Sequence, residues 1–205
     1  MSKKPGNRKR LWVFRLVLLV TAPLIALGGL ELILRLAGFG FDPAFLVRDE
    51  LDETKVRDNY QFAWRFFPKA LARVPQPLRV SRAKPSGVRR IVVLGGSAAM
   101  GDPQPAYGLS RVMQCLLEHR FPQQQFEVIN AAVTAINSHV VLPIAKDCVD
   151  LDADLWVIYM GNNEVNGPYG SGSVFGSRRP SRAMIRASLA YQTTRLGQWM
   201  ASLVA

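Results

Sequence analysis

Histidine and cysteine are scarce in this sequence, which has two of each among 205 residues. The histidines are His119 and His139, and the cysteines are Cys115 and Cys148, which are not in a C-x-x-C spacing. Transition metals are held mostly by close groups of these two residue types. The sequence therefore predicts no metal site, and no motif in it implies another cofactor. The sequence allows either two buried free thiols or a disulfide between Cys115 and Cys148.

Acidic residues are also few, with 15 Asp and Glu against 26 Lys and Arg, so the formal net charge is +11. Such a balance is found in nucleic-acid-binding proteins, but no groove-reading motif is present. We therefore predict no nucleic-acid partner, and the composition does not indicate an oligomeric state. The basic residues gather in two clusters, which are Lys3, Lys4, Arg8, Lys9, Arg10 and Arg15 in the first and Arg178, Arg179, Arg182 and Arg186 in the second.

The first basic cluster adjoins a long apolar run. No charged residue occurs from Leu16 to Leu30, and the apolar flanks extend the segment to residues 11–37. This exceeds the roughly 20 residues that a membrane-spanning helix needs. Because cytoplasmic flanks are rich in Lys and Arg, we predict that residues 1–10 form a basic cytoplasmic tail. The chain is then a single-pass protein of the inner membrane, with the rest of it on the periplasmic or extracellular side.

This segment has two alternatives to a membrane anchor. A cleaved signal peptide needs a shorter apolar region and a small-x-small site, and Ala26-Leu27-Gly28 is the nearest match. A soluble core helix would have a polar face, which the run lacks. The pattern therefore favours an uncleaved anchor.

Residues 38–88 are predicted to be an extended juxtamembrane connector that packs on the following domain. Prolines recur in this region and interrupt any long helix. Phe62, Trp64 and Phe66 alternate, which is typical of a short strand, and an interfacial aromatic belt is the alternative.

From residue 89 onward, strand and helix patterns alternate. Strands are predicted at RRIVVLGG, QFEVINAAV and ADLWVIYMGNNE, the last buried on both faces. Helices are predicted at YGLSRVMQCLLEHRFP, at SHVVLPIAKDCVDL with Ser138 as its N-cap, and over 181–203 after a Gly/Ser-rich loop. This order predicts an α/β domain over residues 89–205 with a parallel sheet. Ligand sites of such sheets lie at the carboxyl ends of the strands.

The loop after the first of these strands, GGSAAMGD, has three candidate chemistries. A Walker loop would need a lysine where Asp102 stands, and the glycines do not form G-x-G-x-x-G. The G-x-S-x-G elbow also fails, because Met100 separates Ala99 from Gly101. A nucleophilic Ser97 stays possible, with Asn162 or Asn163 of the loop GNNE donating to the same oxyanion. The alternative is a structural serine and ordinary turn asparagines.

Three blocks of the sequence resemble the SGNH/GDSL hydrolase superfamily. LGGSAAMGD is similar to its Gly-Asp-Ser-Leu block, with Ser97 at the nucleophile position and Gly96 where the family has aspartate. INAAVTAIN is similar to the second block, which starts at Asn130 and has Ala135 where the family's oxyanion glycine is expected. MGNNE is similar to the Gly-x-Asn-Asp block, with Asn163 as the oxyanion asparagine and Glu replacing Asp at the next position.

The resemblance implies a flavodoxin-like three-layer domain that hydrolyses an ester through an acyl-enzyme. Ser97 would be the nucleophile, and the backbone N–H groups of Ser97 and Ala135 and the side chain of Asn163 would form the oxyanion hole. The phrase ELILRLAGFG further resembles membrane-anchored bacterial members, which often carry tetratricopeptide repeats downstream.

The family's closing Asp-x-x-His block, which supplies the general base, does not occur in these 205 residues. The resemblance therefore implies the N-terminal portion of a longer hydrolase, inactive by itself. The expected partners are the membrane and an ester-containing small molecule or glycan. A non-catalytic, membrane-tethered binding module is the first alternative, and a polysaccharide O-acyltransferase is the second.

Overall fold

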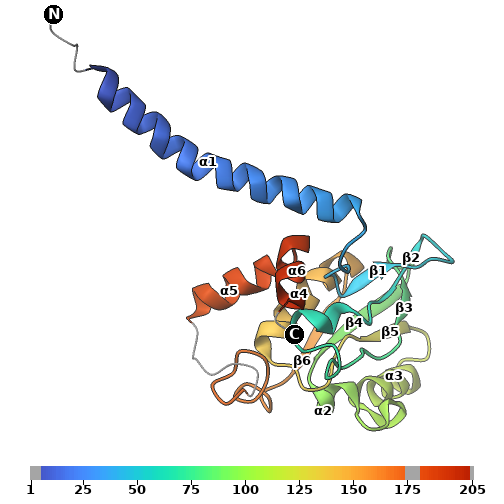
Figure 1. Cartoon of the computed structure of the whole chain (residues 1–205). Coiled ribbons are helices and arrows are strands. Elements are labelled where there is room, and N and C mark those ends of the chain that lie inside the picture. The colour runs from blue at the N-terminus through green and yellow to red at the C-terminus, as the bar shows by residue number, and fades with distance from the viewer. Residues whose placement is uncertain (1–5, 174–180, 204–205) are drawn as a thin grey trace, which may run out of the picture. The chain divides into compact units, whose positions relative to one another are not determined.

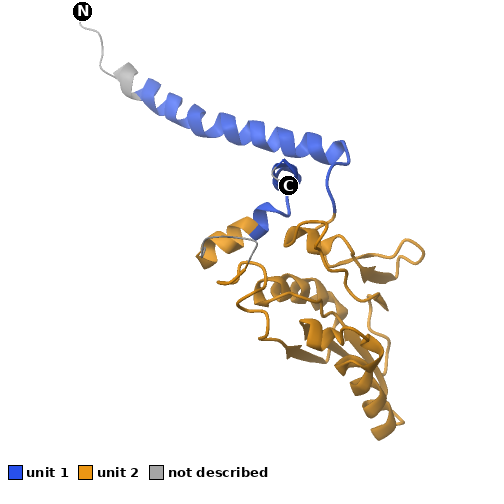
Figure 2. Cartoon of the chain, turned by 60° about the horizontal axis from the view of Figure 1, so that its bottom comes forward, with its two compact units in different colours: residues 1–41, 189–205 blue, residues 42–188 orange. Residues whose placement is uncertain are grey.

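The computed structural model describes residues 6–173 and 181–203, with side chains from residue 10 onward. The chain divides into two compact units (Figure 2). One unit contains residues 1–41 and 189–205, and the other contains residues 42–188. Residues 1–5 of the predicted basic tail and two members of the second arginine cluster, Arg178 and Arg179, lie outside the described residues.

A single long helix dominates the first unit. Helix α1 (Gly6–Leu36) is largely apolar over the 27 residues from Arg10 to Leu36, and an 18-residue window within this stretch has a mean hydropathy of 2.3 and no buried residue. At 1.5 Å per residue this stretch is about 40 Å long, which exceeds the roughly 30 Å of a bilayer's hydrocarbon core. Length and composition thus suit a membrane-crossing helix, and a signal anchor and a signal sequence both fit the observation.

The single helix expected over 181–203 is instead two helices, α5 (Arg182–Tyr191) and α6 (Arg195–Ser202). The Thr194 hydroxyl accepts a hydrogen bond from the Gly197 N–H at 3.0 Å and so caps α6. The Glu31 carboxylate of α1 adds a second cap, accepting the N–H groups of Arg195 and Leu196 at 3.1 and 2.7 Å. These capping groups explain why the helix restarts, a feature that apolar periodicity does not show.

The second unit is a mixed α/β structure with a three-stranded parallel sheet (Figure 1). The sheet order is β5 (Gln125–Asn130), β4 (Val88–Gly95) and β6 (Leu155–Tyr159). Both pairings are parallel, as the alternating pattern predicts. Central β4 is buried from Arg90 to its end. The flanking elements are α2 (Ser97–Met100), η2 (Pro105–Tyr107), α3 (Leu109–Arg120), α4 (Ser138–Cys148) and η3 (Val149–Leu151).

The prediction that β6 is buried on both faces is wrong. Leu155, Ile158 and Tyr159 are 51%, 62% and 52% exposed. The reason is topological, because β6 is an outer strand of the sheet and pairs only with β4 among the described residues. A continuous apolar run identifies a strand but does not say whether it is central.

Residues 42–88 are more structured than the expected connector. They form an antiparallel sheet of β1 (Leu46–Arg48), β2 (Lys55–Asp58) and β3 (Arg79–Ser81). The strand expected at Phe62–Phe66 is wrong, since residues 62–65 form the 3-10 helix η1 (Phe62–Arg65). Phe62 and Phe66 are buried, and Phe62 packs edge-on against Phe45 at 5.3 Å, so these two rings are not an interfacial belt.

Arg90 joins the antiparallel sheet to the parallel one. Its side chain is fully buried, and Nε donates to Glu127 of β5 at 2.6 Å. Nη1 donates to the Leu151 carbonyl at 2.6 Å, and Nη2 donates to the Ser81 carbonyl at the end of β3 at 3.0 Å. A buried charge is tolerated only when it is paired and hydrogen-bonded, and this guanidinium satisfies both conditions.

We expect the substitution Arg90→Met to lower the free energy of unfolding by about 3 kcal/mol or more, because it leaves the buried Leu151 carbonyl, the part-buried Ser81 carbonyl and the Glu127 carboxylate without their donor. Arg89→Met is the matched control. Arg89 is the preceding residue on β4, is largely exposed and, within the described part of the chain, forms an ion pair only with Asp154, at 3.2 Å, so its loss should cost less than about 1 kcal/mol. Chemical denaturation of the detergent-solubilised chain measures both. Equal losses would contradict the role given to Arg90.

Candidate active site

Three loops meet at the carboxyl end of the parallel sheet, because parallel strands end at the same edge. Gly95 pairs with Tyr159 in the ladder between β4 and β6. Beyond β5, the Val133 N–H donates to the Gly95 carbonyl at 3.1 Å. A Cβ on Gly95 would lie 2.0 Å from the Tyr159 carbonyl oxygen, so only glycine permits this approach. The tight turn after β4 thus has a packing reason.

Ser97 is the first residue of α2 and follows Gly96, which has extended backbone geometry. Its side chain is half-buried, and its hydroxyl forms no hydrogen bond with any described residue. Its backbone N–H lies in the first turn of the short helix, where no carbonyl of the same helix can accept from it. The serine therefore presents a free hydroxyl and a free amide at the sheet edge.

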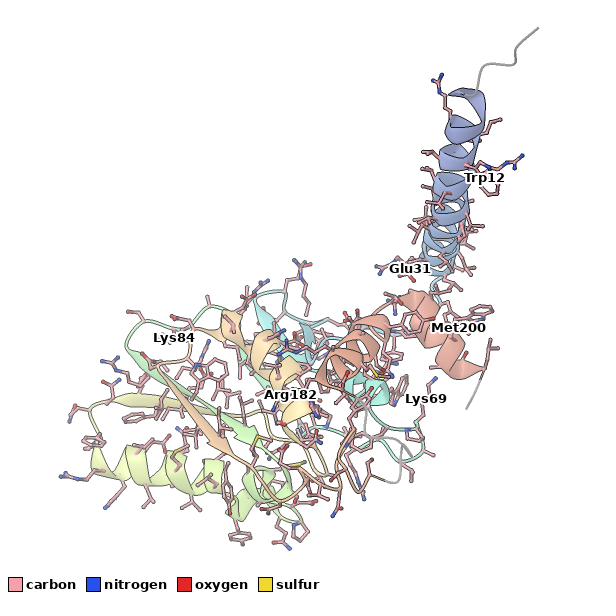
Figure 3. The ribbon with its side chains drawn as sticks, turned by 90° about the vertical axis from the view of Figure 1, so that its left-hand side faces the viewer. Trp12, Glu31, Lys69, Lys84, Arg182 and Met200 are labelled. Carbon is pink, nitrogen blue, oxygen red and sulfur yellow. The ribbon has the colours of Figure 1, made fainter. Side chains whose placement is uncertain are left out.

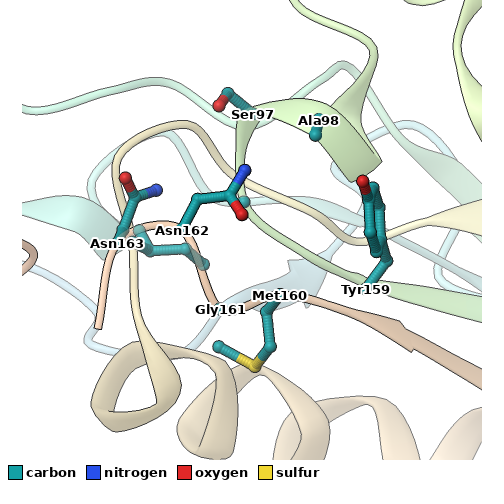
Figure 4. Close-up of a pocket in the computed structure, with 9 residues that line it drawn as sticks. Ser97, Ala98, Tyr159, Met160, Gly161, Asn162 and Asn163 are labelled. Atoms are coloured by element: carbon teal, nitrogen blue, oxygen red, sulfur yellow. The ribbon is translucent and has the colours of Figure 1, made fainter. Parts of the chain in front are cut away.

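Asn163 lies against the same turn. A Cβ on Gly96 would be 3.1 Å from Nδ2 of Asn163, so the carboxamide touches the backbone just before Ser97. Figure 4 shows the Ser97 hydroxyl and the carboxamides of Asn162 and Asn163 around one opening. This pocket is lined by Gly96, Ser97, Ala98, Ile136, Tyr159, Met160, Gly161, Asn162 and Asn163. The serine and both candidate asparagines are thus brought together.

Ala135 does not line this pocket, although the next residue, Ile136, does. Ala135 has a φ of 64°, the left-handed region that glycine adopts most readily. No described residue accepts a hydrogen bond from its N–H. Ala135, at the position where the family has glycine, therefore has a backbone conformation typical of glycine. Its N–H has no acceptor among the described residues, but Ala135 does not line the pocket that Ser97 and Asn163 line.

Asn130, the first residue of the second block, has a structural role. Its Nδ2 donates to the Met100 carbonyl at 3.0 Å and to Oε1 of Gln76 at 2.8 Å. Its Oδ1 accepts from the Ala132 N–H at 3.2 Å. The side chain thus ties the end of β5 to α2, the helix that begins with Ser97.

Glu164 anchors the third loop. One carboxylate oxygen accepts the Ser138 N–H at 2.9 Å, and the other accepts the Ser138 hydroxyl at 2.8 Å. Ser138 is therefore the first residue of α4 and not its N-cap, which is Asn137. The Asn137 side chain donates to the Pro168 carbonyl at 2.8 Å. A carboxylate at a helix N-terminus is favourable. Because Glu164 directly follows Asn163, these hydrogen bonds also fix the loop that contains Asn163. The sequence reasoning missed this cap because its two halves are 26 residues apart.

Neither histidine contacts the serine. His119 is exposed near the end of α3, as expected. His139, in the first turn of α4, packs edge-on against Tyr169 with ring centroids 6.2 Å apart.

Both cysteines are free thiols, Cys148 buried and Cys115 exposed, so the interpretation of both as buried thiols holds only for Cys148.

The pocket has an internal volume of about 10 Å³, close to what one water molecule occupies. Among the described residues, no group of three His, Cys, Asp or Glu side chains could hold a metal ion.

No protein-family model, curated protein or solved structure matches the chain significantly. The chemical capacity of the site thus follows from its own groups, which are one hydroxyl and several N–H donors around a space the size of a single oxygen atom or methyl group.

We expect Ala135→Gly to raise the free energy of unfolding by about 1 kcal/mol, because glycine has no Cβ clash at positive φ. Ala132→Gly is the control, since Ala132 is fully buried and has no positive φ. It should lose about 1 kcal/mol in backbone entropy and packing. Thermal unfolding of the two variants beside the unchanged chain measures the difference. A destabilised Ala135→Gly variant would refute the strain.

We expect Glu164→Ala to cost about 1 to 2 kcal/mol and to speed amide exchange in the first turn of α4, because the cap of that helix is lost. Glu118→Ala removes a carboxylate on the exposed face of α3 that contacts Gln114, and should cost less than about 0.5 kcal/mol. Hydrogen exchange read residue by residue separates the two. Unchanged exchange at residues 138–141 in Glu164→Ala would rule out the cap.

Proposed function

We propose that this chain carries the nucleophile and oxyanion-binding part of a membrane-anchored serine hydrolase of the SGNH/GDSL type that acts on an ester. The observation that supports this most directly is that Ser97 and Asn163 line the same small pocket beyond β4 and β6. The parallel sheet with flanking helices is compatible with the flavodoxin-like, three-layer domain of that family. We propose that the hydrolase-like domain extends from residue 89 to residue 188, and not to residue 205, because residues 189–205 belong to the same compact unit as α1.

In the proposed reaction, the Ser97 oxygen forms a bond to the carbonyl carbon of the ester, and the carbonyl π electrons move to its oxygen. The Ser97 N–H and Asn163 Nδ2 donate to this oxyanion, with the Ala135 N–H as a third donor. The hydroxyl proton passes to a base and then to the departing alkoxide as the carbon–oxygen bond breaks. Water repeats the sequence on the acyl-serine and releases the acid.

No described residue accepts a hydrogen bond from the Ser97 hydroxyl. A serine without a base is a weak nucleophile. The proposal therefore places the general base outside the described residues, and both histidines of this chain are left out of the chemistry. Oxyanion donors alone would still bind a carbonyl oxygen.

Two alternatives stay beside the enzyme. A non-catalytic, membrane-tethered binding module is favoured by the unpartnered Ser97 hydroxyl and by Gly96 and Glu164, which depart from the family pattern. A polysaccharide O-acyltransferase would form the same acyl-serine and pass it to a glycan hydroxyl in place of water.

For location, we propose that α1 is an uncleaved signal anchor in the inner membrane. The basic residues before it would keep the N-terminus cytoplasmic, and residues 42–188 would lie on the periplasmic or extracellular side. Its long, exposed, apolar stretch supports this proposal.

Labelling with a fluorophosphonate probe, carried out on the protein in its native membrane, tests the enzyme. We expect a covalent adduct on Ser97 that disappears in Ser97→Ala. Asn163→Ala should slow labelling by about a hundredfold, the usual cost of losing one oxyanion donor. Ser86→Ala is the control, because Ser86 is exposed and does not line the pocket, so Ser97 should label at the normal rate in that variant.

Absence of an adduct on Ser97, in protein whose thermal unfolding is intact, would reject the enzyme and leave the binding module. With labelling established, release of the acyl group to water alone or to an added glycan decides between hydrolase and O-acyltransferase.

A further inference from the structure

Residues 59–101 contain no acidic side chain at all, but they contain eight basic ones. Most of these are neutralised locally. Arg79 pairs with Asp49, Arg82 with Asp150, Lys84 with Asp152 and Asp154, Arg89 with Asp154 and Arg90 with Glu127, while Arg65 is buried against the Phe62 and Phe66 rings. Lys69 and Arg73 are the remaining two, and neither forms an ion pair with any described residue.

These two cations lie on an exposed loop with exposed apolar side chains between and beside them. Leu71 is 57% exposed and Val74 is 58% exposed. A turn closed by the Leu71 N–H on the Pro68 carbonyl, at 2.8 Å, begins the loop. Cation and apolar residue therefore alternate along the loop, in the sequence KALARV.

Both ends of the loop are held firmly. Phe66 and Phe67 are buried before it, and after it the Gln76 side chain accepts from Asn130 at 2.8 Å. The exposure of Leu71 and Val74 is thus imposed by an ordered frame. Two exposed apolar side chains by themselves are ordinary for a protein surface, so the case for an interaction depends on the charged and aromatic groups beside them.

A pair of aromatic rings lies beside Lys69. The Lys69 ammonium lies 4.7 Å from the centroid of the Trp64 ring, and Tyr60 packs edge-on against Trp64 at 5.8 Å (Lys69 is labelled in Figure 3). Tyr60 is 51% exposed. Trp and Tyr side chains beside Lys and Arg, with aliphatic side chains in front, are the groups enriched where proteins meet lipid head groups. We call these residues the loop surface: Tyr60, Trp64, Lys69, Leu71, Arg73 and Val74.

We propose that the loop surface docks on the head-group region of an anionic lipid bilayer. Leu71 and Val74 would enter the boundary of the acyl chains, while Lys69 and Arg73 meet lipid phosphates. The proposal rests on α1 crossing that membrane and not on the chemistry at Ser97. Only residues 37–41 separate α1 from the second unit, a link that cannot exceed about 20 Å. Such a short tether raises the effective concentration of the bilayer at the loop, so weak contacts suffice.

The test uses the full chain reconstituted in vesicles, with an environment-sensitive fluorophore on the loop in the variant Ala70→Cys/Cys115→Ser. Cys148 stays unlabelled, because burial raises the pKa of its thiol to about 12. The unchanged chain, labelled at exposed Cys115 on α3, is the matched control. Vesicles of phosphatidylcholine alone are compared with vesicles that also contain phosphatidylglycerol, each with and without a lipid-borne quencher.

We expect the residue 70 fluorophore to shift to shorter wavelength and to be quenched by lipid in the phosphatidylglycerol vesicles, while the Cys115 fluorophore stays in water. Adding Lys69→Ala and Arg73→Ala should lower the ratio of docked to undocked loop about twenty-five-fold. Each cation near an anionic leaflet contributes about a factor of five to this ratio. Flotation should be unchanged in that variant, because α1 still holds it in the vesicle.

Three outcomes would overturn the proposal. The residue 70 fluorophore could remain as exposed as the one at Cys115. It could be quenched equally in phosphatidylcholine alone and in the variant without the two cations, which would exclude recognition of anionic lipid. It could be shielded without lipid quenching, which would assign the loop surface to a protein partner or a second copy of the chain.

Discussion

The second unit depends on one buried charge. Arg90 lies at the start of the buried part of the central strand, and its guanidinium holds together a strand end, a neighbouring strand and the turn after α4. The same residue's backbone N–H, followed by the Lys84 ammonium, keeps the pKa of Asp154 below its usual range. Removing the guanidinium would leave several groups unsatisfied at once, so the register between the two sheets is set by hydrogen-bond geometry as well as by apolar burial.

The other end of the same strand is shaped by close backbone approach. Gly95 is packed against the Tyr159 carbonyl, which leaves no room for a side chain there, and a Cβ at Gly96 would press on the Asn163 carboxamide. Asn130 and Glu164, which do not line the pocket, hold the loops around it through their own hydrogen bonds. A rigid frame of this kind holds donors in place before a ligand arrives, which is what an oxyanion site requires.

The two proposals concern different chemistry on one tethered unit. The proposed ester site at the end of the parallel sheet would need a nucleophile, donors and a base, and Ser97 and the N–H groups around it are the candidates for the first two. The loop surface needs only exposed apolar groups with unpaired cations beside them, and the described residues provide both. If α1 crosses the bilayer, its short link keeps the second unit near lipid, so membrane contact by the loop would restrict how the ester site faces its surroundings.

Sequence patterns alone determined the long apolar helix, the three parallel strands and the carboxyl-end loops that contain Ser97 and Asn163. Local periodicity, glycine placement and charge position are properties of neighbouring residues, so they can be read without a fold. Tertiary structure alone decided that β6 is an outer strand, that Phe62 begins a buried 3-10 helix, that Glu164 caps α4 and that Glu31 helps to cap α6. Each of these depends on groups far apart in the chain, and the free energy of such contacts exists only once the chain has brought them together.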